Sequence, residues 1–331
     1  MKKSLAAISA SLATVLGIAL IYTGAVSAQS APVPPTGQAL EIDPPVLDLR
    51  GNAGEVVKQQ IRIRDISTAK LLVKNEINDF TAAGEDGTPK ILLEAGETSP
   101  YSIKNWISPL PQLTLKPREV QPITVTVTIP KDAAPGGYFG VIRFTAEAAE
   151  LTQSGVSLSA SIGTLVLLRV NGTAKEAMNI DEFYATSGGN RGSLFESAPI
   201  KFVVRIKNNG NVHEQPRGQI TVRDMFGQTL ATPNVNLENR NVLPGSIRKF
   251  ESPLDETIIG NKILFGRYTA DLVMTFGDGQ ETKASLSFWV IPYKLIAIVI
   301  ASLIVLFFAI RFALRRYNEA IIDRSRRSRR R

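Results

Sequence analysis

An apolar run near the C-terminus, Leu295–Ile310 (LIAIVIASLIVLFFAI), constrains this 331-residue chain more than any other feature. Together with Tyr293 before it and Phe312 and Leu314 after it, the run is long enough to cross a hydrocarbon core of about 30 Å as a helix. A buried core helix is the alternative, but a domain of ordinary size does not need one that is apolar on every side. We therefore predict a transmembrane helix over residues 293–314.

The charges that follow this run indicate its orientation. Nine arginines and only two acidic residues lie between Arg311 and Arg331, and such basic flanks stay on the cytoplasmic side of a membrane. The tail, residues 315–331, is therefore expected in the cytoplasm, and its last eight residues, from Arg324 to Arg331, are expected to be without structure because they have nothing to bury. Everything between the tail and the N-terminal apolar segment is expected outside the cell, so we predict a single-pass cell-membrane protein.

The N-terminus has the layout of a secretory signal peptide. Lys2 and Lys3 precede the apolar stretch Leu12–Tyr22, and small residues follow up to Ala28. Residues 1–28 are predicted to be removed after Ala28, and an uncleaved N-terminal anchor is the alternative. The next segment, 29–39, is rich in proline and small residues and is expected to be a flexible leader.

Composition narrows the class of function. The formal net charge of +8 comes from the membrane flanks, and the segment between them is close to neutral. No nucleic-acid partner is expected, whereas the basic flanks can contact membrane lipid. The chain has no cysteine and a single histidine, His213, which excludes disulfides, thiolate metal sites and most catalytic arrangements. We predict no enzyme, catalytic residue, cofactor or metal; chemistry by carboxylates alone, as in glycosidases, is the alternative.

Hydrophobicity in the body of the chain alternates with a period of two. Val57–Asp65 and Pro122–Ile129 each alternate apolar with polar residues, which is typical of strands that bury one face. Many such short segments are separated by turns rich in Gly, Asn and Pro, with no long amphipathic helix among them. The prediction is a mainly β protein: two tandem immunoglobulin-like β-sandwiches, residues 40–172 and 173–291, followed by the C-terminal transmembrane helix.

The two halves look like distant copies that differ in length. Each has a tyrosine that opens a strand after a turn, Tyr138 and Tyr268, at the place where a tyrosine corner anchors a sandwich. Between matching positions the first half is longer, because Ile63 to Pro117 spans 54 positions and Ile206 to Pro244 spans 38. The first domain therefore carries about 16 extra residues, which should fall between Asp79 and Ser108.

Three segments of the first domain, Ser102–Ile107, Leu115–Pro117 and Val125–Gly140, resemble the N-terminal domain of the WxL-interacting proteins of bacterial cell walls. The order of parts is also similar: signal peptide, two sandwiches, one span and a basic tail. The resemblance implies that the first domain binds peptidoglycan or another cell-wall polymer, that the second binds a host or surface ligand, and that WxL-type surface proteins are partners. Neither Trp106 nor Trp289 begins a WxL motif, so this chain would be the partner protein.

The extra segment of the first domain carries the candidate ligand-binding residues. Carboxylates and flat aromatic faces are the groups that sugar polymers use, and the segment contains Asp79, Glu85, Asp86, Tyr101 and Trp106. The alternatives are a solvated acidic turn, a packing role for Trp106, and a lid over one end of the core, filled by apolar residues between positions 91 and 93.

These observations favour a non-enzymatic, membrane-anchored surface protein that binds peptidoglycan or another surface protein through its first domain. An extracytoplasmic assembly chaperone or scaffold is the alternative, because immunoglobulin-like domains can donate a strand to exported subunits. A carboxylate-dependent cell-wall enzyme is a further alternative.

The predicted topology is testable with protease on intact, wall-stripped cells. The segment from Gln29 to Trp289 should be digested because it lies outside, and the tail should be spared because the membrane protects it. Fragments are read with antibodies against each end of the chain. Survival of the outer segment would contradict its export.

Overall fold

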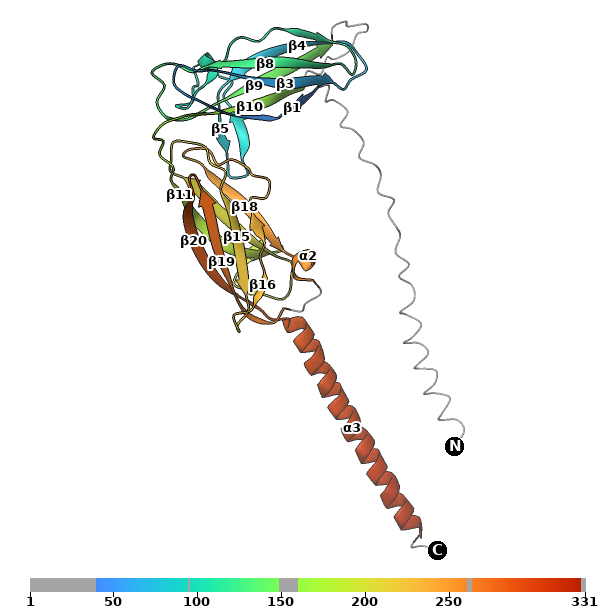
Figure 1. Cartoon of the computed structure of the whole chain (residues 1–331). Helices are drawn as coiled ribbons and strands as arrows, with labels where there is room; N and C mark the ends of the chain where they lie inside the picture. Colours follow the sequence, from blue (N-terminus) through green and yellow to red (C-terminus); the bar gives the residue numbers. More distant parts are fainter. Residues whose placement is uncertain (1–39, 95, 149–159, 261–263, 329–331) are drawn as a thin grey trace. The chain divides into compact units, whose positions relative to one another are not determined.

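The computed structural model describes residues 40–94, 96–148, 160–260 and 264–328 (Figure 1). The predicted signal peptide and leader lie outside these residues. The described chain is mainly β, with two β-sandwiches followed by one long helix, so the predicted fold class is confirmed.

The first sandwich contains a three-stranded sheet in the order β1-β3-β8, a five-stranded sheet in the order β2-β10-β9-β4-β7, and the separate hairpin β5-β6. A 3-10 turn, η1 (Lys104–Trp106), lies between β6 and β7. The strands are β1 (Leu40–Asp43), β2 (Val46–Gly51), β3 (Val56–Asp65), β4 (Leu71–Asn78), β5 (Phe80–Ala83), β6 (Thr88–Ile91), β7 (Leu113–Leu115), β8 (Val120–Thr128), β9 (Gly136–Ala148) and β10 (Ala160–Val170).

The second sandwich packs a sheet of order β12-β11-β14-β18 against one of order β13-β20-β19-β15-β16, with β17 also paired to β15. Its elements are β11 (Met178–Ser187), β12 (Asn190–Gly192), β13 (Leu194–Phe195), β14 (Ile200–Asn208), β15 (Arg217–Arg223), β16 (Thr229–Ala231), β17 (Asn234–Val235), β18 (Ile247–Leu254), α2 (Glu256–Ile259), β19 (Gly266–Phe276) and β20 (Gln280–Val290).

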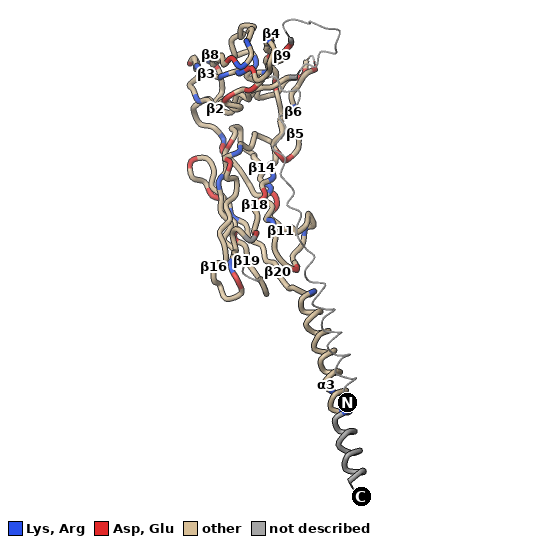
Figure 2. Tube along the Cα trace, turned by 90° about the vertical axis from the view of Figure 1, so that its right-hand side faces the viewer, with Lys and Arg blue, Asp and Glu red and all other residues tan. Residues whose placement is uncertain are grey.

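The period-two pattern places the cores. In β8, Ile123, Val125 and Val127 are buried while Thr124 and Thr128 are exposed, because successive side chains of a strand point to opposite faces. Each sandwich has its own apolar cluster between its sheets. Figure 2 shows basic and acidic residues interspersed along the chain in both sandwiches.

Both tyrosine corners predicted from the sequence are confirmed. The Tyr138 hydroxyl donates to the carbonyl of Ala134 at 3.1 Å, and that of Tyr268 to the carbonyl of Phe265 at 3.4 Å. In each case the hydroxyl bonds to the backbone of the preceding turn, and the Tyr268 ring is buried and stacks on Phe288.

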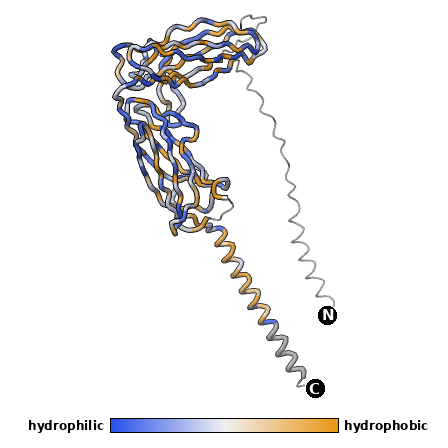
Figure 3. Tube along the Cα trace, in the orientation of Figure 1, coloured by the Kyte–Doolittle hydropathy of each residue, from blue (hydrophilic) through white to orange (hydrophobic). Residues whose placement is uncertain are grey.

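The last helix, α3 (Tyr293–Ser328), is apolar over its first half (Figure 3). Residues 293–316 are long and apolar enough to cross a membrane, and the chain buries none of them. The expectation of an unstructured end is wrong for residues 324–328, which continue the same helix. A helix that the span has already nucleated can grow into a polar segment, since each added residue gains a backbone hydrogen bond.

One buried polar side chain organises the turn after β14. The amide of Asn208, fully buried, donates to the carbonyls of Val212 at 2.7 Å and Val242 at 2.9 Å, and its oxygen accepts the Gly210 N–H at 2.8 Å. The neighbouring Asn209 is exposed. Asn208 therefore stabilises the turn from inside the core, whereas Asn209 lies on the surface.

This contrast gives a stability prediction. Replacing Asn208 by Ala should lower the free energy of unfolding by about 2–4 kcal/mol, because three buried backbone groups lose their partners. Asn209→Ala, the matched control, should change it by less than about 0.5 kcal/mol. Urea unfolding of the full chain measures both, and equal losses would contradict the structural role of Asn208.

Candidate functional site

Three regions of the described chain carry polar groups in arrangements that a fold alone does not require. They are a buried ion-pair cluster where β10 meets the second sandwich, the hairpin β5-β6, and the first half of β10. The first of them is assembled from segments far apart in the sequence.

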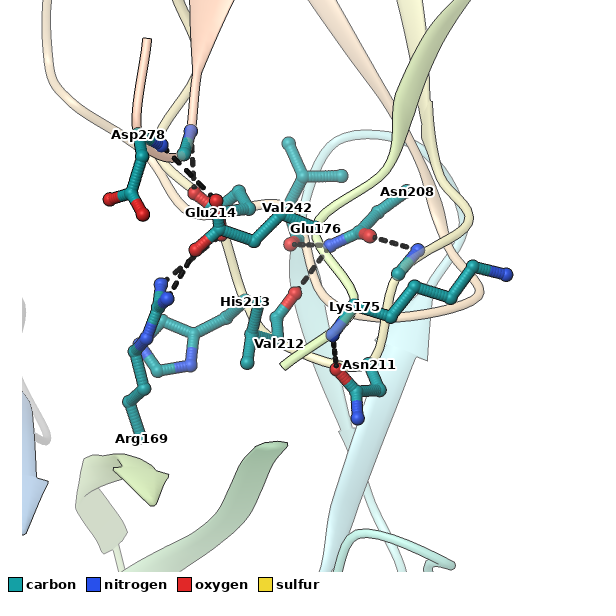
Figure 4. Close-up of polar contacts among 12 residues, drawn as sticks. Arg169, Lys175, Glu176, Asn208, Asn211, Val212, His213, Glu214, Val242 and Asp278 are labelled. Carbon is teal, nitrogen blue, oxygen red and sulfur yellow. Dashed lines mark hydrogen bonds and ion pairs between the residues drawn. The ribbon is translucent and has the colours of Figure 1, made fainter. Parts of the chain in front are cut away.

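The ion-pair cluster joins the two sandwiches (Figure 4). Arg169 on β10 pairs with Glu176 in the connection to β11, and its second terminal nitrogen lies 3.4 Å from a carboxylate oxygen of Glu214 in the second sandwich. Both carboxylate side chains are less than 10% exposed. Their remaining oxygens accept the backbone N–H groups of Gly277 and Asp278, each at 3.1 Å. Removing one partner would leave a buried charge unpaired, which is costly.

Burial raises the pKa of Glu214, and the nearby charge of Glu176 raises it further, while the Gly277 N–H and Arg169 oppose this. Beside the cluster is a polar hollow of about 280 Å³ in which Nε2 of His213 lies 3.3 Å from Asp48. The hydrogen bond with His213 lowers the pKa of Asp48, and burial opposes it. The charged groups of the cluster form ion pairs and hydrogen bonds with one another across the junction, so the cluster links the two sandwiches.

The sequence-predicted site residues Glu85 and Asp86 lie at the tip of the hairpin β5-β6. Glu85 pairs with Arg205 of the second sandwich, and its carbonyl accepts the N–H of Lys249 at 2.7 Å. The hydrogen bond and charge of Arg205 lower the pKa of Glu85. Asp86 accepts the N–H and hydroxyl of Thr88 at 2.9 and 2.8 Å, which lowers its pKa.

The other predicted site residues lie deeper. Asp79 is buried and accepts the Ser102 hydroxyl at 2.6 Å. Tyr101 packs on Phe139 with ring centroids 5.7 Å apart, and Trp106 packs on Tyr138 at 4.3 Å.

Only Glu85 and Tyr101 share a hollow, which is about 420 Å³ and lies between the hairpin and the Leu243–Ile247 segment of the second sandwich. Asp79, Asp86 and Trp106 do not line it. A sugar-binding role for these five residues stays a prediction.

The extra segment of the first domain therefore contacts the second sandwich. Of its apolar residues, Ile91 packs on a small cluster around Phe139, whereas Leu93 is 60% exposed. The hairpin thus covers part of the core as a lid would. Its polar tip contacts Arg205 and Lys249, a use that the sequence did not suggest.

The third region is the open edge of β10. Its ladder with β9 runs from Ala160 to Val170, but its parallel ladder with β2 covers only Leu165–Val170. The Leu165 N–H points to the β2 side, where it donates to the carbonyl of Pro45 at 2.9 Å. Because strand backbone groups alternate in direction, the N–H and C=O of Ser161 and Gly163 point the same way. Within the described part of the chain, no group bonds to them.

The described residues contain no group of three or more His, Cys, Asp or Glu side chains placed to hold a metal ion. The arrangements above can therefore bind through hydrogen bonds, ion pairs and apolar contact. The β10 edge also offers backbone groups that no described residue uses.

No protein-family model and no curated protein matches the sequence. Among solved structures, the YadV chaperone is similar with a TM-score of 0.36 and 10% identity, covering 76% of this chain and all of that one. The class 5 fimbriae chaperone CfaA gives 0.38 and 15%, with 76% and 99% covered. The E. coli chaperone DraB gives 0.33 and 13%, with 76% and 96% covered. At these scores the likeness says nothing about function. The similarity to WxL-interacting proteins rests on the sequence segments alone.

The raised pKa of Glu214 predicts how stability depends on pH. Because the folded pKa lies above that of the unfolded chain, the folded state retains a proton that the unfolded chain has lost, so this group's contribution falls as the pH rises from about 4.5 through the folded pKa. Glu214→Gln cannot titrate. The free energy of unfolding of the wild type, relative to this variant, should decrease between about pH 4 and pH 7. Urea unfolding across this range measures it, and a constant difference would refute the assignment.

Proposed function

We propose that this chain is a non-enzymatic, membrane-anchored protein that binds an extended segment of another exported protein along the open edge of β10. It would thereby act as an assembly chaperone or scaffold for surface subunits. The observation that supports the proposal is that the outward N–H and C=O groups of Ser161 and Gly163 have no partner among the described residues. An added strand would satisfy them through main-chain hydrogen bonds.

The other long sheet edges of the described chain carry features that oppose strand addition. Exposed Pro122 interrupts the edge of β8, and Glu41 and Asp43 lie on β1. The outer edge of β20 bears Glu281 and Lys283. Proline and charged side chains are the usual protection of an edge against unwanted pairing.

The open half of β10 has no such protection. Ser161 is exposed and uncharged, Ile162 packs on the core, and Gly163 has no side chain. This difference from the edges of β8, β1 and β20 favours a binding role for the open half of β10.

The anchor in this proposal is α3, which would cross the cell membrane with the sandwiches outside and the basic end in the cytoplasm. Peptidoglycan as a ligand and WxL-type proteins as partners remain hypotheses based on sequence resemblance. Sedimentation of the full chain with purified peptidoglycan tests the first, and the Ser161 variants below separate that binding from strand addition.

The proposal is tested with Ser161→Pro in the full chain held in lipid nanodiscs. Proline removes the outward N–H and leaves the ladder with β9 intact, since that N–H faces away from β9. Extended decapeptides are selected from a random library against the wild type. Their affinity should fall at least about tenfold for the proline variant, the loss of roughly one hydrogen bond plus a steric clash.

Ser161→Thr is the matched control, because it keeps the N–H and the hydroxyl that lies 2.8 Å from that of Thr145. It should retain wild-type affinity. Bound peptide should also slow hydrogen exchange at the Ser161 and Gly163 amides, a direct sign of ladder formation. Equal binding by wild type and proline variant, or unchanged exchange, would rule out this edge as the site.

A further inference from the structure

The end of the second sandwich next to α3 carries a group of exposed apolar side chains that its core does not use. We call this group the base patch; its members are Leu194, Met225, Phe226, Phe265 and Trp289, which are between 47% and 79% exposed. In the described part of both sandwiches, the exposed phenylalanine and tryptophan side chains all belong to it.

Sheet register and one side-chain contact place the patch residues at the same end of the sandwich. Trp289 lies beside Leu194 in the parallel pairing of β20 with β13, and opposite Arg267 on β19. The end of the Met225 side chain lies against Gly266, where an added Cβ would be 2.3 Å from it. Phe265 precedes that glycine and Phe226 follows that methionine. Four separate segments thus bring apolar side chains to one end of the sheet.

The chain leaves this same end to enter α3 (Figure 1). Strand β20 ends at Val290 and α3 begins at Tyr293, so only Ile291 and Pro292 lie between them. Even fully extended, that connection spans about 10 Å. The headgroup layer on each side of a bilayer is about 5–8 Å thick. If α3 begins at the hydrocarbon boundary, Val290 lies no more than about 10 Å from it, at the level of the headgroup layer or just outside it.

We propose that the base patch is a lipid-docking surface that inserts its aromatic side chains into the outer interface of the membrane that α3 crosses. Tryptophan and other amphipathic rings favour this depth, and an apolar patch that touches lipid is no longer exposed to water. Lys294, which pairs with Glu196 at 2.6 Å, places a basic group at the same level. The inference rests on α3 crossing the membrane, as proposed above.

Tryptophan fluorescence tests this surface, because the chain has only Trp106 and Trp289. Both are replaced by Phe in the full chain, and a single reporter is introduced as Phe226→Trp. The protein is placed in vesicles of phosphatidylcholine and phosphatidylglycerol, with or without bromine on the acyl chains. Emission from the reporter should fall at least twofold in brominated vesicles, because position 226 is in lipid.

Two further reporters in the same background make the result decisive. Leu237→Trp is the matched control, since Leu237 is 74% exposed and Phe226 79%, but it follows β17 and lies at the opposite end of the sandwich. It should be insensitive to bromine. Phe307→Trp reports on α3 itself and should be quenched.

Quenching at position 307 without quenching at 226 overturns the docking surface and leaves the membrane span standing. A reporter at 226 that acrylamide cannot reach and bromine does not quench also overturns it, because the patch would then be covered by a second copy or another protein. No quenching at 307 means that α3 has not inserted, and the span and the docking surface then fail together.

Discussion

Apolar burial between paired sheets is the constraint on which everything else in this chain depends. With no cysteine, neither sandwich can use a disulfide to restrict its unfolded state. Each fully buried Ile, Val, Leu or Phe contributes about 1.5–3 kcal/mol, and conformational entropy takes back most of the sum. A polar group enclosed by such a core costs free energy unless it has a hydrogen-bond partner. Asn208 shows this, since its donors and its acceptor all have backbone partners.

The same requirement shapes the junction between the sandwiches. Arg169, Glu176 and Glu214 are mostly removed from water, yet the charges are paired and the spare carboxylate oxygens accept backbone N–H groups. A buried pair of this kind adds little net stability but penalises any arrangement that separates it. The hairpin β5-β6 adds a second contact between the sandwiches, the ion pair of Glu85 with Arg205. The junction therefore determines the relative orientation of the two sandwiches, and it contributes little to their free energy of unfolding.

Sequence reasoning reached the features that local pattern determines. Alternation in β8 and the turns before Tyr138 and Tyr268 are encoded within a few residues, and the apolar run of α3 is encoded by its length. Features that join distant positions were not predictable in this way. Glu85 and Arg205 are separated by 120 residues. The local sequence of an acidic loop is the same whether the loop faces solvent or an arginine, so this contact could not be predicted from it.

The open edge and the base patch were missed for a related reason. The edge exists because β2 pairs with β10 only from Leu165 onward, and the register between strands that lie over 100 residues apart leaves no local signal. The patch collects single apolar residues from four segments, and each of them alone is an ordinary surface residue. Met225 and Phe226 in a turn hinted at an exposed apolar pair, but nothing in the sequence placed that turn beside the start of α3.

Two strands connect these surfaces through the junction. On β10, the open edge is at the first residues and Arg169 is next to the last. On β19, Gly266 lies at the base patch, and Phe276 lines the polar hollow beside Glu214. A strand of 11 residues is about 35 Å long, and β19 is held by a neighbour on each side over most of its length, whereas β10 has its second neighbour only from Leu165. If the patch is held in the lipid interface, the ion pairs at Arg169 decide how the β10 edge is presented above the membrane. If the ion pairs of the junction were lost, the orientation of the β10 edge above the membrane would no longer be fixed. The lipid contact of the base patch and the hydrogen-bonding groups of the edge would be unchanged. The role of the junction is therefore separate from the roles of the two surfaces.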